Sequence, residues 1–171
     1  MPEIMAEGRY IRLVREGRWE YAQRTNASGV VVILALTPND EVLFVEQYRV
    51  PVGARVIEFP AGLAGDIAGA EDEALSLAAA RELEEETGWR AGRVEILTSG
   101  PVSAGMTSEI LTFFRAYDLV RVSDGGGDET EDIVVHAVPL ADVRQWLEQK
   151  RTDGVMADPK VYAGLFFAAV D

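Results

Sequence analysis

The chain has 171 residues, of which 48% are hydrophobic and 26% are charged, as is typical of one soluble globular domain. It contains no cysteine, which excludes a disulfide framework, a thiol nucleophile and a cysteine-based zinc site. Its formal net charge of −13 disfavours a nucleic-acid partner, because such partners normally require a basic face. A small anionic ligand fits this charge only if a cation stands between the ligand and the carboxylates.

Neither a membrane span nor a secretory signal is expected. The longest apolar run, Val30–Leu36, is much shorter than a bilayer requires. The first ten residues include acids and have no apolar core. We therefore expect a cytoplasmic protein with no membrane partner.

Strand patterns rich in Val, Ile and aromatic residues recur along the chain, and helical patterns are fewer. The expected strands are, in chain order, Tyr10–Val14, Gly29–Leu36, Glu41–Val45, Val56–Phe59, Leu111–Tyr117 and Ile133–Val138, with a hairpin turn at Thr37–Asp40. The expected helices are Glu73–Thr87 followed by Gly88, Leu140–Arg151, and Asp158–Val170 with Asp158 as N-cap. The expected irregular loops are Gly62–Asp72 and Ser123–Thr130.

These elements predict an α/β sandwich in which helices pack against a mixed sheet. No repeat or domain linker interrupts residues 1–171, so one domain is expected. The single histidine, His136, falls in an apolar strand pattern, and we expect it to be a strand residue with an ordinary partner.

The most informative stretch lies near the end of the expected helix Glu73–Thr87. Glu82, Glu85 and Glu86 are spaced i, i+3, i+4 and therefore share one helix face, while Glu84 points elsewhere. Like charges repel, and the negative end of the helix dipole costs each of them about 0.3–1 kcal/mol. A hard divalent cation would offset this cost. Without a wider pattern, a solvated acidic face would be the simpler explanation.

The wider pattern resembles a known family. Glu73, Arg81, Glu82, Glu85, Glu86 and Gly88 are arranged as in the Nudix box, the strand–loop–helix signature of the Nudix hydrolases. Further motifs resemble the ADP-ribose pyrophosphatase branch of that family: Trp19-Glu20 with Arg24, Glu46–Arg49, Glu58–Leu63 and Glu131–Ile133. The resemblance covers about residues 9 to 169 and implies a Nudix-type α/β/α sandwich with an N-terminal β extension.

Two departures from the family pattern stand out. Ten residues, Leu63–Asp72, separate Gly62 from Glu73, which is five more than the family has. If Gly65 were the box glycine the gap would be shorter, but Pro60-Ala61-Gly62 carries the branch signature. Relatives often have proline in the middle of the segment that reads Ser103-Ala104-Gly105 here.

The resemblance assigns roles to the acids and their neighbours. It implies that Glu82, Glu86 and the Ala61 carbonyl bind Mg²⁺, for which Mn²⁺ is a possible substitute, with Glu85 holding metal or an ordered water. Arg81 would pair with a glutamate and fix its rotamer. Glu131 would accept the proton of the attacking water, with Glu129 as the fallback, unless Glu131 is simply a solvated loop residue.

Substrate contacts are implied for another set of residues. Arg49 resembles an arginine that contacts the phosphates. Glu58 resembles a substrate-site glutamate, and an exposed strand position near an edge is an equal alternative for it. Trp19 and Glu20 resemble the residues that hold the nucleobase of the substrate. The alternative is that Trp19 anchors its strand in a dimer. The remaining implied substrate-binding residues are Arg24 and Gly62.

Three functions are compatible with these motifs. The first is Mg²⁺-dependent hydrolysis of ADP-ribose or a related ADP-sugar to AMP and a sugar phosphate. The second is hydrolysis of GDP-mannose or another nucleoside diphosphate sugar, because Gly125–Gly127 before an acidic stretch also resembles that branch. The third, a non-catalytic nucleotide-sugar sensor, is disfavoured by the intact box glutamates. The resemblance to this branch also implies a homodimer, so residues 1–28 are expected to form dimerising strands beside a catalytic core at 29–171.

Overall fold

A computed structural model describes residues 2–127 and 132–169, and it contains mixed sheets and few helices. The strands are β1 Glu3–Glu7, β2 Ile11–Glu16, β3 Trp19–Arg24, β4 Gly29–Ala35, β5 Glu41–Arg49, β6 Ala54–Glu58, β7 Ala61–Ala64, β8 Trp89–Arg90, β9 Arg93–Pro101, β10 Ile110–Tyr117, β11 Val120–Arg121, β12 Val134–Pro139 and β13 Met156–Ala157. The α-helices are α1 Leu75–Thr87, α2 Val143–Thr152 and α3 Pro159–Ala168, and short 3₁₀ turns occupy Val50–Val52 and Leu140–Asp142.

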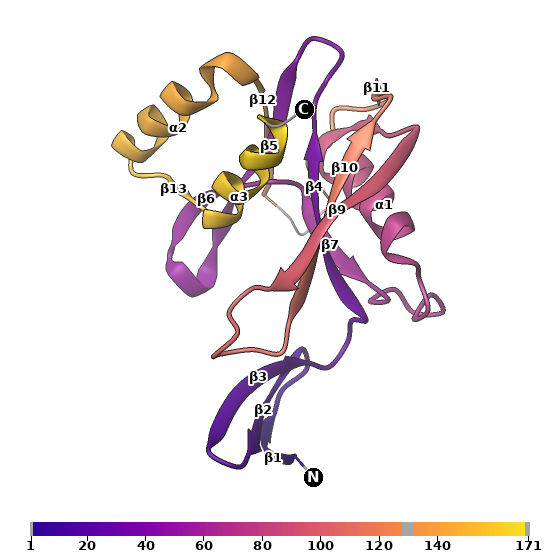
Figure 1. Ribbon diagram of the computed structural model, residues 1–171, viewed down its shortest axis with the longest axis vertical. Helices are drawn as coiled ribbons and strands as arrows, with labels where there is room; N and C mark the ends of the chain where they lie inside the picture. The colour runs from indigo at the N-terminus through magenta and orange to yellow at the C-terminus, as the bar shows by residue number, and fades with distance from the viewer. Residues whose placement is uncertain (1, 128–131, 170–171) are drawn as a thin grey trace.

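Two four-stranded sheets form the body of the molecule (Figure 1). One has the order β7-β4-β10-β9, in which β4 and β10 are parallel and the outer pairs are antiparallel. The other has the order β12-β5-β6-β13, with its last pair parallel. Helix α1 lies beside the first sheet, whereas α2 and α3 lie beside the second.

Two apolar clusters hold these layers together. The cluster beneath α1 includes Ala79 and Leu83 of the helix and Ile33 and Phe114 of the first sheet. The cluster between the sheets and the other two helices is larger, and its buried members are Val32, Leu34, Val42, Phe44, Ile57, Phe59, Leu111, Phe113, Val138, Val143, Leu147, Val161 and Ala168. Because β4 contributes alternate residues to both clusters, it is covered on both faces, which explains its continuous apolar sequence.

The N-terminal strands form a separate antiparallel sheet, β1-β2-β3, that projects from one end of the body (Figure 1). It is attached to the β9–β10 loop by hydrogen bonds from Ala22 N to Met106 O and from Ser108 N to Ala22 O. Large apolar side chains on this sheet remain exposed in the single chain, namely Ile4, Met5, Ile11, Leu13 and Trp19.

The fold class predicted from the sequence is confirmed, and most element positions agree. Gly88 ends α1 with φ 74°, and Asp158 caps α3 by accepting a hydrogen bond from Lys160 N. Thr37–Asp40 forms the predicted turn, with Thr37 N donating to Glu41 O. Among the helices and strands of the described residues, no helix is long and apolar enough to cross a membrane.

Several predicted boundaries were wrong. The predicted loop Gly62–Asp72 begins as a strand, because β7 pairs with β4. Helix α1 starts at Leu75 instead of Glu73, since Glu73 turns away to bind Arg81. Strand β5 extends to Arg49, four residues beyond the predicted end. The nine-residue strand β9 was missed. Of the predicted loop Ser123–Thr130, residues 128–130 lie outside the described residues.

Candidate active site

Helix α1 presents its acids to strand β7 at the edge of the first sheet. Its apolar side, with Ala78, Ala79 and Leu83, is completely buried, which fixes the rotation of the helix about its axis. Glu86 is 3% exposed, and its Oε2 accepts a hydrogen bond from Ala61 N at 3.0 Å. Of the predicted shared face, Glu82 and Glu86 are therefore packed against a strand, whereas the side chain of Glu85 is exposed.

Gly62 allows this close approach. A Cβ atom at position 62 would lie 1.9–2.4 Å from the carboxylate of Glu82, so only glycine leaves room for that side chain as it stands. The resulting burial raises the pKa of Glu82 to about 7, although Arg81 opposes the shift. At Gly65, the alternative box glycine, φ is 74°, and a Cβ atom would lie 2.6 Å from Glu71 O and 2.9 Å from Ser28 Oγ, not near Glu82.

Arg81 is the cation at the centre of these acids. Its Nη1 donates to Glu82 at 2.9 Å and to Glu85 at 3.1 Å, and its Nε and Nη2 both bind Glu73 at 3.1 Å. Nη2 also donates to Leu63 O at 3.0 Å. The hydrogen bonds from Arg81 lower the pKa of Glu73. The predicted pairing of Arg81 with a glutamate is therefore present, with three glutamates instead of one.

A divalent cation fits the chemistry of this donor set. Glu86, which is buried, and Glu82, which is partly buried, present carboxylates on one helix face, and hard cations prefer oxygen ligands. Within the described residues, no three acidic or histidine side chains already converge as a set of metal ligands. Arg81 instead holds Glu82 and Glu85, and Glu84 points away to bind Arg90. The metal-ligand assignment stays a prediction.

Arg49 and Glu58 form a second group, on strands β5 and β6. Arg49 Nε donates to Glu58 Oε2 at 2.6 Å, and both residues line a cavity of about 360 Å³. Glu58 is 7% exposed, so the alternative of an exposed edge position is wrong. The other residues that line this cavity are Pro51, Val52, Val56, Met156, Ala157, Asp158 and Pro159.

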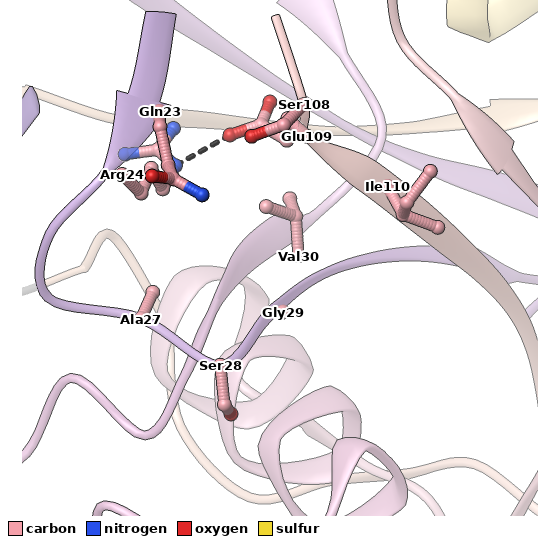
Figure 2. A pocket seen from close by; sticks show the side chains of 9 residues that line it. All are labelled: Gln23, Arg24, Ala27, Ser28, Gly29, Val30, Ser108, Glu109 and Ile110. Atoms are coloured by element: carbon pink, nitrogen blue, oxygen red, sulfur yellow. Dashed lines mark hydrogen bonds and ion pairs between the residues drawn. The ribbon is translucent and has the colours of Figure 1, made fainter. Parts of the chain in front are cut away.

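Arg24 belongs to a third group, at the junction between the N-terminal sheet and the body. It forms an ion pair with Glu109 at the start of β10, and both line a cavity of about 240 Å³ (Figure 2). Sequence reasoning missed Glu109, because the two residues are 85 positions apart and no local pattern links them.

Trp19 and Glu20 lie apart from α1. Trp19 is 56% exposed and lines a cavity of about 350 Å³ with Glu16, Tyr21, Ala104, Gly105, Thr107 and Ser108, none of which belongs to α1. Glu20 binds Arg15 at 2.8 Å on the neighbouring strand. The single chain therefore does not bring the predicted base-binding residues to the predicted metal-binding helix. Glu129 and Glu131 lie outside the described residues.

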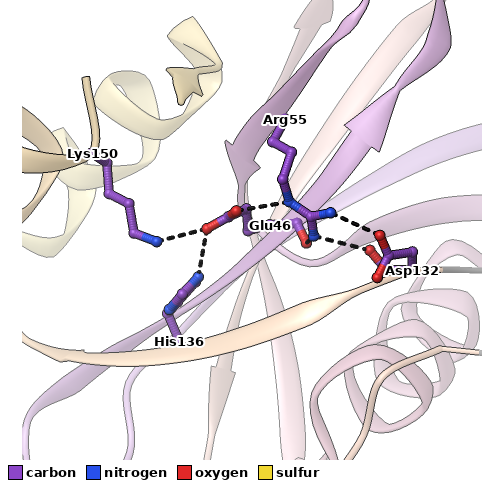
Figure 3. Close-up of polar contacts among 5 residues, drawn as sticks. All are labelled: Glu46, Arg55, Asp132, His136 and Lys150. Carbon is purple, nitrogen blue, oxygen red and sulfur yellow. Dashed lines mark hydrogen bonds and ion pairs between the residues drawn. The ribbon is translucent and has the colours of Figure 1, made fainter. Parts of the chain in front are cut away.

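A further buried carboxylate, Glu46, lies on β5 of the second sheet; it belongs to the Glu46–Arg49 motif, which assigned it no role. Glu46 is 7% exposed and binds Lys150 at 2.7 Å, Arg55 at 2.8 Å and His136 at 2.9 Å (Figure 3). Burial alone would raise the pKa of Glu46, but the three hydrogen bonds lower it to about 2. His136 also contacts the edge of Trp146, so its predicted role as a strand residue with an ordinary partner is confirmed.

Glu46→Gln should destabilise the fold by about 2–4 kcal/mol at pH 7, because it leaves buried cationic partners without their anion. A carboxylate whose folded pKa is depressed stabilises above its unfolded pKa, 4.5 here, and loses that contribution as the pH falls through about 2. The difference in unfolding free energy between wild type and Glu46→Gln should therefore shrink between pH 4.5 and 2. Urea titrations of both proteins at several pH values measure this difference in unfolding free energy. Glu148→Gln, which removes an exposed partner of Arg151, is the control, and a pH-independent gap would contradict the prediction.

Comparison with known proteins agrees with this geometry. The family model described as NUDIX domain matches residues 25–163. The chain is 34% identical over 124 residues to the methanol dehydrogenase activator of Bacillus methanolicus and 34% identical over 123 residues to the ADP-ribose pyrophosphatase of Bacillus subtilis. These matches cover 72% and 71% of this chain, but the chain spans only 64% of the length of each relative.

Two further comparisons extend the picture. The GDP-mannose pyrophosphatase of an Enterobacter species is 32% identical over 141 residues, covering 78% of this chain and 69% of that protein. A solved structure described as an ADP compounds hydrolase superposes with a TM-score of 0.73 at 24% identity, covering 99% of this chain and 90% of that one, which establishes the fold. The matched domain, the relatives and the fold agree, and the chain belongs to the Nudix family.

Proposed function

We propose that the protein hydrolyses the pyrophosphate bond of ADP-ribose or a related ADP-sugar, giving AMP and a sugar phosphate, with Mg²⁺ as the metal ion. The observation that carries this proposal is the placement of two glutamates of the Nudix box, the buried Glu86 and the partly buried Glu82, against β7. Relatives named ADP-ribose pyrophosphatase and GDP-mannose pyrophosphatase support a nucleoside diphosphate sugar as the substrate class. A cytoplasmic homodimer is part of the same proposal.

Glu82, Glu86 and the Ala61 carbonyl would hold the cation, and Glu85 would hold metal or an ordered water. When bound, a divalent cation neutralises phosphate charge and makes phosphorus more electrophilic; Mn²⁺ is a possible substitute. The chain must then release Glu82 and Glu85 from Arg81. Glu73 can retain the guanidinium, because it binds Arg81 through both carboxylate oxygens.

Substrate phosphates need further positive charge, and Arg49 and Arg24 supply it in this proposal. Glu58 orients Arg49 and Glu109 orients Arg24, since each carboxylate already holds its guanidinium. Glu131 takes the proton from the attacking water, and Glu129 is the fallback for this role.

GDP-mannose is the second candidate substrate. The relative of that name and the Gly125–Gly127 segment favour it. A non-catalytic sensor is disfavoured, because Glu82, Glu85 and Glu86 are all retained. A panel of ADP-ribose, other ADP-sugars and GDP-mannose, assayed with Mg²⁺ and compared by kcat/KM, distinguishes the three candidate functions. A higher kcat/KM for GDP-mannose would replace the first candidate, and no turnover of any substrate would favour the sensor.

The metal assignment predicts that Glu86→Gln loses most activity at saturating Mg²⁺ while the fold survives, and that Glu82→Gln behaves in the same way. The reason is that each substitution removes an anionic oxygen ligand without changing side-chain volume. Activity against Mg²⁺ concentration and circular dichroism measure the two effects. Glu84→Gln, on the side of α1 that binds Arg90, is the matched control. Near-normal turnover in both ligand variants would remove the assignment.

The assignment of Glu131 as the general base predicts that Glu131→Gln lowers kcat by about 10²–10⁴-fold with little change in substrate affinity. The amide cannot accept the proton of the water, but it retains the size of the side chain. Single-turnover kinetics with ADP-ribose give the comparison. Should Glu129→Gln carry the loss instead, Glu129 is the base; if neither variant loses activity, the base lies elsewhere.

Substitution of Trp19 tests both the proposed nucleobase subsite and the proposed homodimer. Because its cavity contains no residue of α1, we propose that the N-terminal sheet of one copy completes the site of another. Stacking on an indole stabilises a base by about 1–3 kcal/mol, so Trp19→Ala should raise KM for ADP-ribose by about tenfold. Light scattering should report a dimer for both proteins. A lone 18.7 kDa species for wild type would contradict the dimer, and a variant that dissociates would make Trp19 an anchor instead.

A further inference from the structure

Arg81 binds two groups of acceptors through different nitrogens. Nη1 donates to Glu82 at 2.9 Å and to Glu85 at 3.1 Å. Nε and Nη2 bind the two carboxylate oxygens of Glu73, and Nη2 also donates to Leu63 O at 3.0 Å. These five bonds occupy all five N–H groups of an arginine side chain. Both acids that Nη1 holds are acids to which the proposed function gives a role at the metal ion.

Asp66 is a further anion beside the same guanidinium. Its Oδ1 lies 3.8 Å from Arg81 Nη2, which is an ion-pair distance but too long for a hydrogen bond. The side chains of Asp66 and Arg81 are 30% and 22% exposed, so solvent screens their attraction less than it screens a fully exposed pair. Within residues 2–127 and 132–169, no hydrogen bond or other ion pair engages the Asp66 carboxylate. That carboxylate can therefore take up more of the charge of Arg81.

The main chain on either side of Asp66 is held in place, although the loop is longer than the family pattern. Ser28 N and Oγ both donate to Ala64 O, two residues before Asp66. At Gly65 the chain passes so close to Glu71 O that a Cβ atom would lie 2.6 Å away. Asp66 is thus placed beside the guanidinium by its own backbone and does not have to reach it from a free loop.

Metal binding would change what Arg81 can bind. When Glu82 and Glu85 turn to a divalent cation, Nη1 loses both acceptors, and a second positive charge lies near the guanidinium. The acids that remain beside Arg81 are then Glu73 and Asp66. A residue alters the affinity for a ligand only if it interacts differently with the free and the loaded protein. Asp66 meets this condition, because its attraction for Arg81 matters most when the other acids have left.

We propose that Asp66 is a positioning residue that retains Arg81 when Glu82 and Glu85 are released, and that it thereby raises the affinity of these acids for a divalent cation. The inference rests on the proposed function, in which the acids of α1 hold the metal ion. Asp66 is not itself a ligand, because it acts through the guanidinium. Glu73 is the first anchor of Arg81, and the longer loop of this chain supplies the second.

Binding of Mn²⁺ alone, without substrate, tests the role of Asp66, and electron paramagnetic resonance measures the free ion. Asp66→Asn should raise the Kd for Mn²⁺ about two- to fivefold, which is the range that a partly screened ion pair contributes. Glu71→Gln is the matched control, because it removes one charge from the same loop but its carboxylate accepts from Gly69 N instead of pairing with Arg81. Its Kd should stay within about 1.5-fold of wild type, since salt screens an exposed charge. Asp66→Glu restores the charge and should restore the affinity.

Thermal unfolding gives a second measurement that does not depend on turnover. Without metal, Asp66→Asn should leave Tm almost unchanged, because Arg81 keeps its hydrogen-bonded partners. With Mn²⁺, the rise in Tm should be smaller than in wild type, since a ligand that binds more weakly stabilises the fold less. An unchanged Kd in Asp66→Asn would overturn the inference. Equal weakening in Asp66→Asn and Glu71→Gln would also overturn it, because the effect would then be one of net charge.

Failure of the proposed function is recognisable separately. If Glu82→Gln and Glu86→Gln both bind Mn²⁺ as tightly as wild type, the metal assignment fails, and the role of Asp66 fails with it. If both variants lose binding while Asp66→Asn keeps the wild-type Kd, the metal assignment stands and only the positioning role of Asp66 is lost.

Discussion

Arg81 holds together a helix face that would otherwise repel itself. Its guanidinium lies among Glu73, Glu82 and Glu85 and also donates to the carbonyl of Leu63. The acids occupy the later turns of α1, where the helix dipole is unfavourable to negative charge. One planar cation with five N–H donors can meet all these acceptors at once, which a lysine could not do. The loop before α1, strand β7 and the helix are joined at this single residue.

The same interaction sets the chemistry of the edge of the sheet. Because Arg81 binds the Leu63 carbonyl, the acidic face of α1 is drawn onto β7, where Gly62 offers no side chain. Glu82 then loses water, and its pKa rises to about 7 through burial even though Arg81 favours the charged form. A carboxylate buried in this way is costly to the fold, and a cation supplied from solution would lower that cost. The burial of Glu82 therefore lowers the stability of the fold at the place where the proposed function requires negative charge.

Local patterns predicted the parts of the fold that local forces determine. The apolar run of β4 and the end of α1 at Gly88 follow directly from burial and helix capping. Strand β9 was missed because it is the outer strand of its sheet, carries a bulge opposite Phe113 and Phe114, and is mostly exposed. Strand β7, with the sequence Ala-Gly-Leu-Ala, has little intrinsic strand preference and exists because β4 pairs with it.

The site shows the same division between local and long-range information. The box acids were found because they are close in sequence, whereas Glu109 was not, because it meets Arg24 only in the folded chain. Arg24 and Arg49, which the proposed function assigns to the substrate phosphates, share one feature: each is already paired with a carboxylate. In each pair the carboxylate binds Nε, so in the proposed function a pyrophosphate would meet the other N–H groups of the same guanidinium, in a chain that already carries 29 acids. The carboxylate partners therefore matter to this proposal as much as the arginines, because they fix the directions in which those N–H groups point.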